Sequence, residues 1–527
     1  MRTLLINARV YSPGARDASA LLVSGSEIAW LGDAGSAADL SAERTVDLAG
    51  ALVIPAFVDA HFHTTDTGLS LSGLELGAAG SLAEALQAVE RAARASGGRP
   101  LLGSGWDETR WPQGRAPTAA ELDRASYGGV VYLARTDAHS AVVSSALLAS
   151  VPGIAGLDGY SADGRLTKAA HHAARAVARS AITAGQRAEL QRVALRQAAS
   201  YGVAAVHEMA GPEISSAEDL AALLALVAGH GKGGSEAEPY PEVFGYWGEL
   251  HGAAAAAELG AVGAGGDLFC DGSIGSHTAG MLQPYLDLPT GGADARGYLR
   301  YDTAELAEHL IECTEAGLQG GFHAIGDAAT GQVVAAMRLA AERLGSRIPA
   351  AGHRIEHAEL IGDVPALAAT GLIASVQPAF DATWGGDHGM YAQRLGVERA
   401  RRLNPLAEFA AAGVPLAFGA DSPVTPVDPW GAVRAAVHPS NPAHALSPRA
   451  ALTAHTRGGW RAARADADGS GVLAPGAPAS YAVFAAGPLA VDAADERLSR
   501  WSTDERSGVP GLPDLAPGGG LPRCLRT

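Results

Sequence analysis

The sequence predicts an α/β protein in which a (β/α)8 barrel is joined to a small β-sandwich built from both ends of the chain. Residues 1–55 and 471–486 consist of short strand-like runs separated by turn residues. The residues between them alternate short apolar runs with longer alanine-rich stretches of helical character. This alternation is typical of parallel sheets, and over such a length it favours a closed barrel over an open sheet.

The chain divides accordingly. We expect residues 1–55 and 465–502 to form the β-sandwich and residues 56–464 to form the barrel. The stretch from about 66 to 175 is interpreted as an insert, loop-like and rich in tryptophan at first and helical later. Residues 503–527 are rich in proline and glycine, which predicts a loose tail.

The composition narrows the classes of function. Of the 527 residues, 47% are hydrophobic and 18% are charged, which is typical of a folded globular protein. A net charge of −17 disfavours binding to nucleic acids and to anionic membranes. The three cysteines (Cys270, Cys313 and Cys524) form neither a disulfide framework nor a four-thiolate metal site. Because we find neither a signal-peptide core nor a membrane-spanning run, we expect a soluble, cytoplasmic protein.

Polar side chains recur where the apolar runs end. His61 and His63 follow one run, and their i, i+2 spacing places them on the same face of a strand. His323 and His357 end two later runs, and Asp421 follows a fourth. Each residue alone also fits a core histidine or a capping aspartate. Together they converge on the end of the barrel where barrel enzymes place their active sites.

Imidazole and carboxylate ligands in this arrangement suit zinc, with iron or manganese as alternatives. A bound divalent ion lowers the pKa of water to about 7, so that hydroxide is available at neutral pH. A carboxylate beside that water can take its proton and pass it to a leaving nitrogen. The pattern therefore predicts a metal-dependent hydrolase.

The chain resembles the amidohydrolase superfamily, and within it the YtcJ-like branch (amidohydrolase family 3) that includes N-substituted formamide deformylase. The similar segments run over nearly the whole chain and include PAFVDAHFH, GWDETRWP, RTDAHSAVVSSALL, DGSIGSHTAGMLQPY, GFHAIGDAAT, HRIEHAEL and FGADSPV. The resemblance implies a composite β-sandwich with a (β/α)8 barrel. It also implies that His61, His63, His323 and His357 belong to a metal site and that Asp421 is the proton-shuttling carboxylate.

One departure from this branch concerns a lysine that can be carboxylated to bridge two metal ions. Asp267 occupies its position, and the only two lysines of the chain, Lys168 and Lys232, lie outside the barrel-strand motifs. We expect one tightly held ion, or two ions bridged by Asp267 or Glu208. An indirect or structural role for Asp267 is left open. Smaller departures are His277, where arginine is common, and Ser480, where aspartate is common.

Residues expected to contact the substrate lie in two regions. One loop carries two tryptophans, an arginine and an aspartate, which suit a planar or carboxylate-bearing molecule but equally suit packing of the insert onto the barrel. The other candidates lie at or after apolar runs. The first set is Trp106, Asp107, Arg110 and Trp111; the second is His139, Asp271, Ser273 and His277.

These observations predict hydrolysis of a non-peptide C–N bond, amide or formamide-like, in a small molecule. Asp421 would move the proton, and His357 would help to polarise the oxygen. Deamination of a ring C=N bond is the alternative within the hydrolases. The alternative from another class is a non-catalytic metal- or ligand-binding protein on a decayed barrel. The expected partner is the substrate alone, without nucleic acid or membrane, and a homodimer is also allowed.

Overall fold

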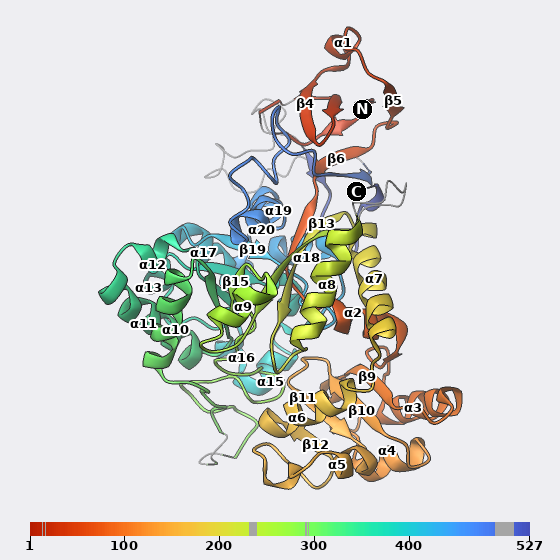
Figure 1. Ribbon diagram of the computed structural model, residues 1–527, viewed down its shortest axis with the longest axis vertical. Helices are drawn as coiled ribbons and strands as arrows, with labels where there is room; N and C mark the ends of the chain where they lie inside the picture. Colours follow the sequence, from red (N-terminus) through yellow and green to blue (C-terminus); the bar gives the residue numbers. More distant parts are fainter. Residues whose placement is uncertain are drawn as a thin grey trace.

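The computed structural model describes residues 1–12, 14–15, 17–230, 240–289, 292, 295–487, 489–490 and 511–526. It has three tiers (Figure 1). The N-terminal strands and the C-terminus lie together at the top of this view, the barrel lies in the middle, and a separate α/β insert lies at the bottom. Among the described residues, none of the helices combines the length and apolar character needed to cross a bilayer.

Two four-stranded sheets form the upper tier. One has the order β4-β3-β1-β5, with β1 (Arg2–Ile6), β3 (Ala20–Ser24), β4 (Glu27–Gly32) and β5 (Arg44–Asp47). The other has the order β2-β6-β20-β23, with β2 (Arg9–Val10), β6 (Leu52–Pro55), β20 (Tyr481–Ala485) and β23 (Arg523–Arg526). Both contribute apolar side chains to one core, including Leu5, Leu21, Val53 and Val483.

Strand β20 joins the two ends of the chain because it pairs antiparallel with β6, with Val483 opposite Val53. The expectation of a loose tail is wrong for its last residues, since β23 pairs antiparallel with β20. Residues 491–510, which include part of the expected tail and sandwich, lie outside the described residues.

The barrel is the predicted parallel sheet of eight strands, in the order β19-β18-β17-β16-β15-β14-β13-β7. The strands are β7 (Phe57–Phe62), β13 (Val203–Ala210), β14 (Glu242–Trp247), β15 (Gly263–Ala264), β16 (Gln319–Ala324), β17 (Arg354–His357), β18 (Ile373–Val376) and β19 (Leu416–Phe418). Strand β15 is short, but its ladder resumes after a glycine pair, where Cys270 N donates to His323 O at 3.0 Å. The first and last strands meet just beyond β19, where Asp421 N donates to His61 O at 2.8 Å.

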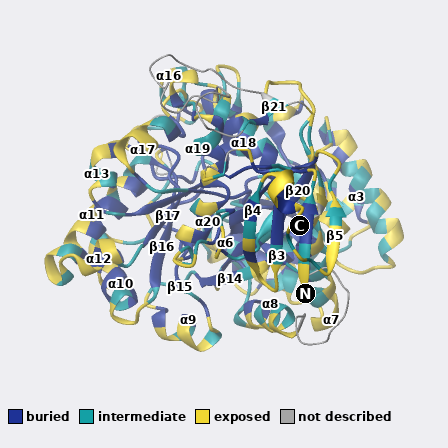
Figure 2. Ribbon diagram, turned by 90° about the horizontal axis from the view of Figure 1, so that it is seen from above, coloured by how far each residue is buried: buried dark blue, intermediate teal, exposed yellow. Residues whose placement is uncertain are grey.

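Helices surround the barrel, and they are buried on the inner side and exposed on the outer side (Figure 2). Asp302 begins one of them with a reciprocal cap to Glu305, which satisfies two amide groups at the helix start. The helices around the barrel are α2 (Thr64–Ser72), α7 (Ala184–Ser200), α8 (Ala217–His230), α9 (Ala253–Leu259), α10 (Thr303–Glu315), α11 (Asp327–Leu344), α12 (Arg347–Ala350), α13 (Val364–Ala368), α14 (Pro378–Trp384), α15 (Met390–Leu395), α16 (Val397–Ala400), α17 (Leu406–Ala412), α18 (Pro429–Val437), α19 (Pro448–Ala454) and α20 (Arg457–Ala462).

The insert is an α/β unit rather than a loop followed by a helix. Its five-stranded sheet has the order β12-β11-β10-β9-β8, with β8 (Leu74–Glu75), β9 (Leu101–Trp106), β10 (Val131–Arg135), β11 (Ser140–Val143) and β12 (Arg165–Thr167). Its helices are α3 (Leu82–Ser96), α4 (Ala119–Ala125), α5 (Ser145–Ser150) and α6 (Lys168–Arg179). Helix α3 buries Leu82, Ala85 and Val89, the i, i+3, i+7 face expected of an amphipathic helix.

Candidate metal centre and active site

Six side chains meet at the carboxyl ends of the barrel strands. His61 lies in β7, His323 in β16 and His357 at the end of β17, while His63 precedes α2. Asp267 follows β15 and Asp421 follows β19. All six are buried. We call this group the His/Asp centre: His61, His63, His323, His357, Asp267 and Asp421.

Asp267 lies in the middle of the His/Asp centre and contacts all four imidazoles. Its Oδ1 is 3.5 Å from His61 Nε2, 3.3 Å from His323 Nδ1 and 3.4 Å from His357 Nε2, and its Oδ2 is 3.3 Å from His63 Nε2. Asp421 Oδ1 lies on one side only, 3.1 Å from His63 Nε2 and 3.6 Å from His61 Nε2. The short side chain of Asp267, at the position where relatives usually have lysine, therefore contacts all four histidines of the centre.

Each imidazole directs one nitrogen outward to a hydrogen-bond acceptor. His61 Nδ1 lies 3.0 Å from Glu356 Oε2, and Arg354 holds that carboxylate in place from below. The other outward contacts are His63 Nδ1 to Met209 O at 2.9 Å, His357 Nδ1 to Gln377 Oε1 at 2.9 Å and His323 Nε2 to Gly272 O at 3.3 Å. An oxygen that only accepts fixes the proton on the outer nitrogen, so the inner nitrogen presents a lone pair to the centre.

Four lone pairs facing two carboxylates repel each other unless a positive charge lies between them. His61 Nε2 is buried and has no hydrogen-bond partner among the described residues. Burial lowers the pKa of His61, but the carboxylates of Asp267 and Asp421 outweigh it and raise the pKa to about 10. The same competition raises the pKa of His63 to about 10. The centre therefore either takes up protons or binds a cation.

The donor set fits a divalent cation. One group of ligand atoms within 4.8 Å of one another comes from His61, Asp267 and His357, and another comes from His61, His63 and Asp421. Imidazole nitrogens with carboxylate oxygens are the ligands typical of zinc, iron and manganese sites. Outer hydrogen bonds that fix the imidazole tautomers are typical of metal-binding histidines.

Local backbone geometry brings two of these side chains into place. His357 has φ of 68° and Asp421 has φ of 52°, both in the left-handed region that costs about 1–2 kcal/mol for a residue with a side chain. Along β17, Arg354 and Glu356 share the face directed into the barrel. Regular alternation would direct His357 to the opposite face, so its left-handed backbone accounts for its place beside Asp267.

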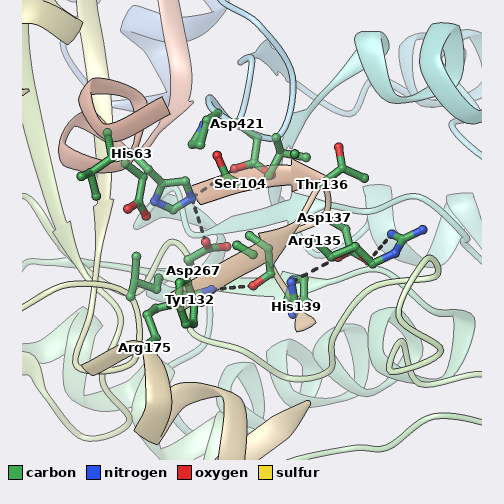
Figure 3. A pocket seen from close by; sticks show the side chains of 18 of the residues that line it. His63, Ser104, Tyr132, Arg135, Thr136, Asp137, His139, Arg175, Asp267 and Asp421 are labelled. Atoms are coloured by element: carbon green, nitrogen blue, oxygen red, sulfur yellow. Dashed lines mark hydrogen bonds and ion pairs between the residues drawn. The ribbon is translucent and has the colours of Figure 1, made fainter. Parts of the chain in front are cut away.

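A cavity of about 90 Å³ opens above the His/Asp centre, between the barrel and the insert (Figure 3). Strands β9 and β10 and helix α6 of the insert form one wall, and the centre forms the floor. A smaller chamber adjoins it beside His357 and Asp421 and is lined by Phe380, Trp384 and Tyr391. We call the larger space the active-site cavity.

None of the four candidate residues of the WDETRWP loop lines this cavity or the adjoining chamber, so the geometry favours a packing role for this loop. Trp106 Nε1 donates to Leu133 O at 2.8 Å and Trp111 Nε1 donates to Ala79 O at 2.8 Å. Asp107 caps a short 3-10 turn, and Arg110 is exposed. Both indoles belong to the core of the insert, which is the packing interpretation of the same pattern.

In the second set of substrate candidates, two residues line the cavity or the adjoining chamber and two do not. His139 lies within the active-site cavity, its ring centre 4.8 Å from that of His323, and Ser273 lines the adjoining chamber. Asp271 lines neither space, because it accepts hydrogen bonds from the backbone of Gly280, Ile325 and Gly326. His277 lines neither space and lies 3.0 Å from Asp287.

Glu208 and the lysines lie apart from the centre. Glu208 Oε2 accepts hydrogen bonds from Thr64 N at 2.8 Å and Thr64 Oγ1 at 2.5 Å, and Glu208 is in neither ligand group. Burial raises the pKa of Glu208 to about 7. Lys168 begins α6 and lies 3.3 Å from Asp158, and Lys232 lies outside the described residues.

A buried ionic network in the cavity wall was not predicted from the sequence. Arg135 contacts Asp107, Glu108 and Asp137 at 3.1, 2.8 and 2.9 Å. Burial alone would raise the pKa of Asp137, but Arg135 lowers it to about 2. Asp137 in turn accepts from Ser273 Oγ at 2.6 Å, which ties the insert to the loop after Asp267. The RTDAHS motif contains Arg135 and Asp137, but the other two carboxylates that contact Arg135 come from a different part of the chain.

The similarity of the chain to known proteins extends well beyond the site. The chain is 27% identical over 474 residues to the protein LONG AFTER FAR-RED 3 of Arabidopsis thaliana, covering 83% of this chain and 79% of that protein. It is 31% identical over 153 residues, 28% of each chain, to an N-substituted formamide deformylase of Arthrobacter pascens. A metal-dependent hydrolase from Pyrococcus horikoshii shares the fold, with a TM-score of 0.72, 27% identity and coverage of 93% and 99%.

A model of the amidohydrolase family matches residues 44–503, which include the whole barrel and every residue of the His/Asp centre. The resemblance inferred from the motifs is thereby confirmed. The fold, the family match and the similarity to a metal-dependent hydrolase agree with a centre whose donors suit a divalent ion. The chain belongs to the amidohydrolase family and is a hydrolase.

Proposed function

We propose that the protein hydrolyses a non-peptide C–N bond, amide or formamide-like, in a small organic molecule. The observation that carries the proposal is the His/Asp centre, where four imidazoles with fixed outer nitrogens turn their inner nitrogens towards two carboxylates. The stretch of 31% identity to an N-substituted formamide deformylase supports the formamide-like class.

Zinc is the metal that we propose, with iron or manganese as alternatives, because imidazole and carboxylate donors suit all three. The residues that would hold it are His61, His63 and Asp421 on one side of the centre and Asp267, His323 and His357 on the other. When bound, such an ion lowers the pKa of water to about 7 and polarises a carbonyl group. Asp267 contacts both sides, so we propose that it is a ligand rather than only a structural residue.

Asp421 is the proposed proton carrier. It lines both the active-site cavity and the adjoining chamber, so its carboxylate is accessible to water and substrate. It would take a proton from the attacking water and deliver it to the leaving nitrogen, which departs as a neutral amine. His357 fits a ligand better than a donor to the carbonyl oxygen, since its Nδ1 proton is directed to Gln377 and Nε2 carries a lone pair.

The test is hydrolysis of a panel of N-substituted formamides and small amides by the zinc-loaded protein, compared with the Asp421→Asn variant. We expect turnover to fall about 10²-fold or more in this variant, since a general acid–base group is lost. Metal content should fall less than in an Asp267→Asn variant, because Asp421 contacts two of the four histidines and Asp267 contacts all four. The matched control is Asp39→Asn, an exposed carboxylate far from the site, which should keep full activity.

Full activity of the Asp421→Asn variant would remove Asp421 from the mechanism. A metal-loaded protein that hydrolyses no member of the panel would favour the non-catalytic alternative. Release of ammonia from a ring C=N compound, with no amide cleaved, would reassign the protein as a deaminase.

A further inference from the structure

Three arginines line the active-site cavity, and their charges are balanced very differently. Arg135 is surrounded by three carboxylates within 3.1 Å. Arg179 forms an ion pair with Asp66, which lines the same cavity. Neither guanidinium therefore presents a free positive charge to a ligand.

Arg175 differs from both. Its side chain is buried, with 7% of the residue exposed, and it lines the active-site cavity. Within the described part of the chain, no carboxylate lies within ion-pair distance of it. Glu213 is the acidic residue that Arg175 contacts, but through its backbone: Glu213 O accepts from Arg175 Nη1 at 3.2 Å. The Glu213 carboxylate itself is committed to Arg300.

The donors of Arg175 are only partly used. Nε donates to Tyr132 Oη at 3.4 Å, Nη1 to Glu213 O at 3.2 Å and Nη2 to Ala138 O at 2.5 Å. A guanidinium carries five N–H groups, so among the described contacts one N–H remains on each Nη atom. Two parallel N–H groups of one guanidinium match the two oxygens of a carboxylate. Arg175 helps to lower the pKa of the Glu213 carboxyl, but no described carboxylate contacts the guanidinium directly. A buried cation without such a contact is costly, and an anionic ligand beside it would lower that cost.

The position of Arg175 relates it to the reaction. Figure 3 shows Arg175 beside Tyr132 on one side of the cavity, with His63 and Asp421 on the other. Ala138, which accepts from Arg175, directly precedes His139, whose ring faces that of His323. The lining of the cavity also includes the apolar side chains of Leu69, Leu102, Ile214 and Phe269.

We propose that Arg175 binds a carboxylate of the substrate, so that the enzyme acts on amides or formamides with an apolar body and a carboxylate at the end remote from the C–N bond. This inference rests on the proposed function and adds the substrate class. The carboxylate recognition that the sequence suggested for Arg110 is thereby reassigned to a residue of α6. Arg175 and Arg179 lie one helical turn apart, and only the partners in the folded chain distinguish them.

The experiment measures binding of compounds that have no C–N bond, so the result does not depend on turnover. The probes are phenylacetate, 3-phenylpropionate and 4-phenylbutyrate, each compared with the corresponding primary alcohol by calorimetry on the zinc-loaded protein. We expect at least one carboxylate to bind about 10- to 100-fold more tightly than its alcohol, the range for a charge-assisted pair. The Arg175→Met variant should lose that preference, and Arg175→Lys should keep only part of it because lysine lacks the paired N–H groups.

The matched control is Arg192→Met, which removes the same charge from a partly exposed site on α7 and should keep the wild-type preference. Carboxylate affinity that survives in Arg175→Met measures binding to the metal itself. An unchanged preference in Arg175→Met, or carboxylates that bind no more tightly than alcohols to the wild-type protein, would overturn the proposal. If Arg175→Met does not fold, an unchanged preference in Arg175→Lys overturns it equally.

The two proposals fail in different ways. Carboxylate preference that depends on Arg175, without cleavage of any amide, would leave the binding site in place and reject the reaction. Amide hydrolysis with equal kcat/KM for N-formyl-6-aminohexanoate, whose carboxylate lies remote from the C–N bond, and for its carboxamide would keep the reaction and reject Arg175 as the determinant of substrate class.

Discussion

Replacing Asp267 by asparagine removes one negative charge from the middle of the His/Asp centre and leaves the size of the side chain almost unchanged. In the native protein its two oxygens lie 3.3–3.5 Å from inner nitrogens of four histidines. A metal ion held between those nitrogens would lose an anionic ligand in the Asp267→Asn variant. We therefore expect metal affinity to fall steeply.

The size of the effect separates a ligand from a supporting residue. Loss of an outer residue that only orients a ligand weakens metal binding about 10- to 100-fold. Loss of an anionic ligand should exceed this range, and we expect a decrease of about 10³-fold, or about 4 kcal/mol. With free zinc buffered at about ten times the wild-type Kd, the native protein would be about 90% loaded and the variant about 1%.

The assay is competition with a chromophoric chelator, combined with circular dichroism to confirm that the variant is folded. Glu208→Gln is the control, because Glu208 is a buried acid near the site whose Oε2 is bound by Thr64 instead. Its metal affinity should stay within about 10-fold of the wild-type value, below the range for an orienting residue. An Asp267→Asn variant that binds zinc within 100-fold of the wild type, or a Glu208→Gln variant that loses it, would refute the reasoning.

Reconstitution of the apoprotein with metal should proceed equally well with and without bicarbonate, and a bicarbonate requirement would contradict this. The Lys168→Met variant should keep its metal content, because Lys168 contacts Asp158 and lies outside the centre. Burial lowers the pKa of His353 to about 3 and of His455 to about 4. The unfolded chain takes up these protons at about pH 6.5, so the contribution of each histidine to the free energy of unfolding should be constant above that pH and fall below it, by about 1.4 kcal/mol per pH unit until its folded pKa is reached; urea unfolding of the native protein and of the His353→Gln and His455→Gln variants between about pH 4.5 and 7.5 measures this contribution as a difference, and a difference that does not change with pH would contradict it. Trp106→Phe should lower thermal stability, since it loses a buried hydrogen bond to Leu133 O, and leave KM unchanged; a raised KM with unchanged stability would return Trp106 to the substrate site.

The barrel and most of the His/Asp centre could be predicted because both follow from strand position. Parallel strands bring their carboxyl ends to one edge, so His61, His323 and Asp421 had to converge once the strands were placed. The left-handed backbone at His357 could not be predicted in the same way, because alternation along β17 places Glu356 and His357 on opposite faces. Glu356, which orients His61, was missed for the same reason.

The insert was harder to predict because its strands lack a clear alternating pattern. Strand β9 reads LLGSGW, in which two glycines interrupt the apolar pattern. Without that sheet, an aromatic–arginine loop such as WDETRWP resembles a binding loop as much as a core. The hydrogen bonds from Trp106 and Trp111 to backbone oxygens decide between the two, and they exist only in the folded insert.

Two parts of the chain form the active-site cavity, and one of them is dispersed along the sequence while the other is contiguous. The residues proposed to carry the reaction come from strand ends dispersed between His61 and Asp421, so their arrangement depends on the closure of the entire barrel. The facing wall, with Arg175, comes from one uninterrupted stretch between β8 and the end of α6. Substrate recognition and the reaction can therefore evolve separately. Exchange of this one segment between relatives would change the substrate that binds and leave the dispersed residues of the His/Asp centre unchanged. A relative's substrate should accordingly be inferred from its insert, not from its histidines.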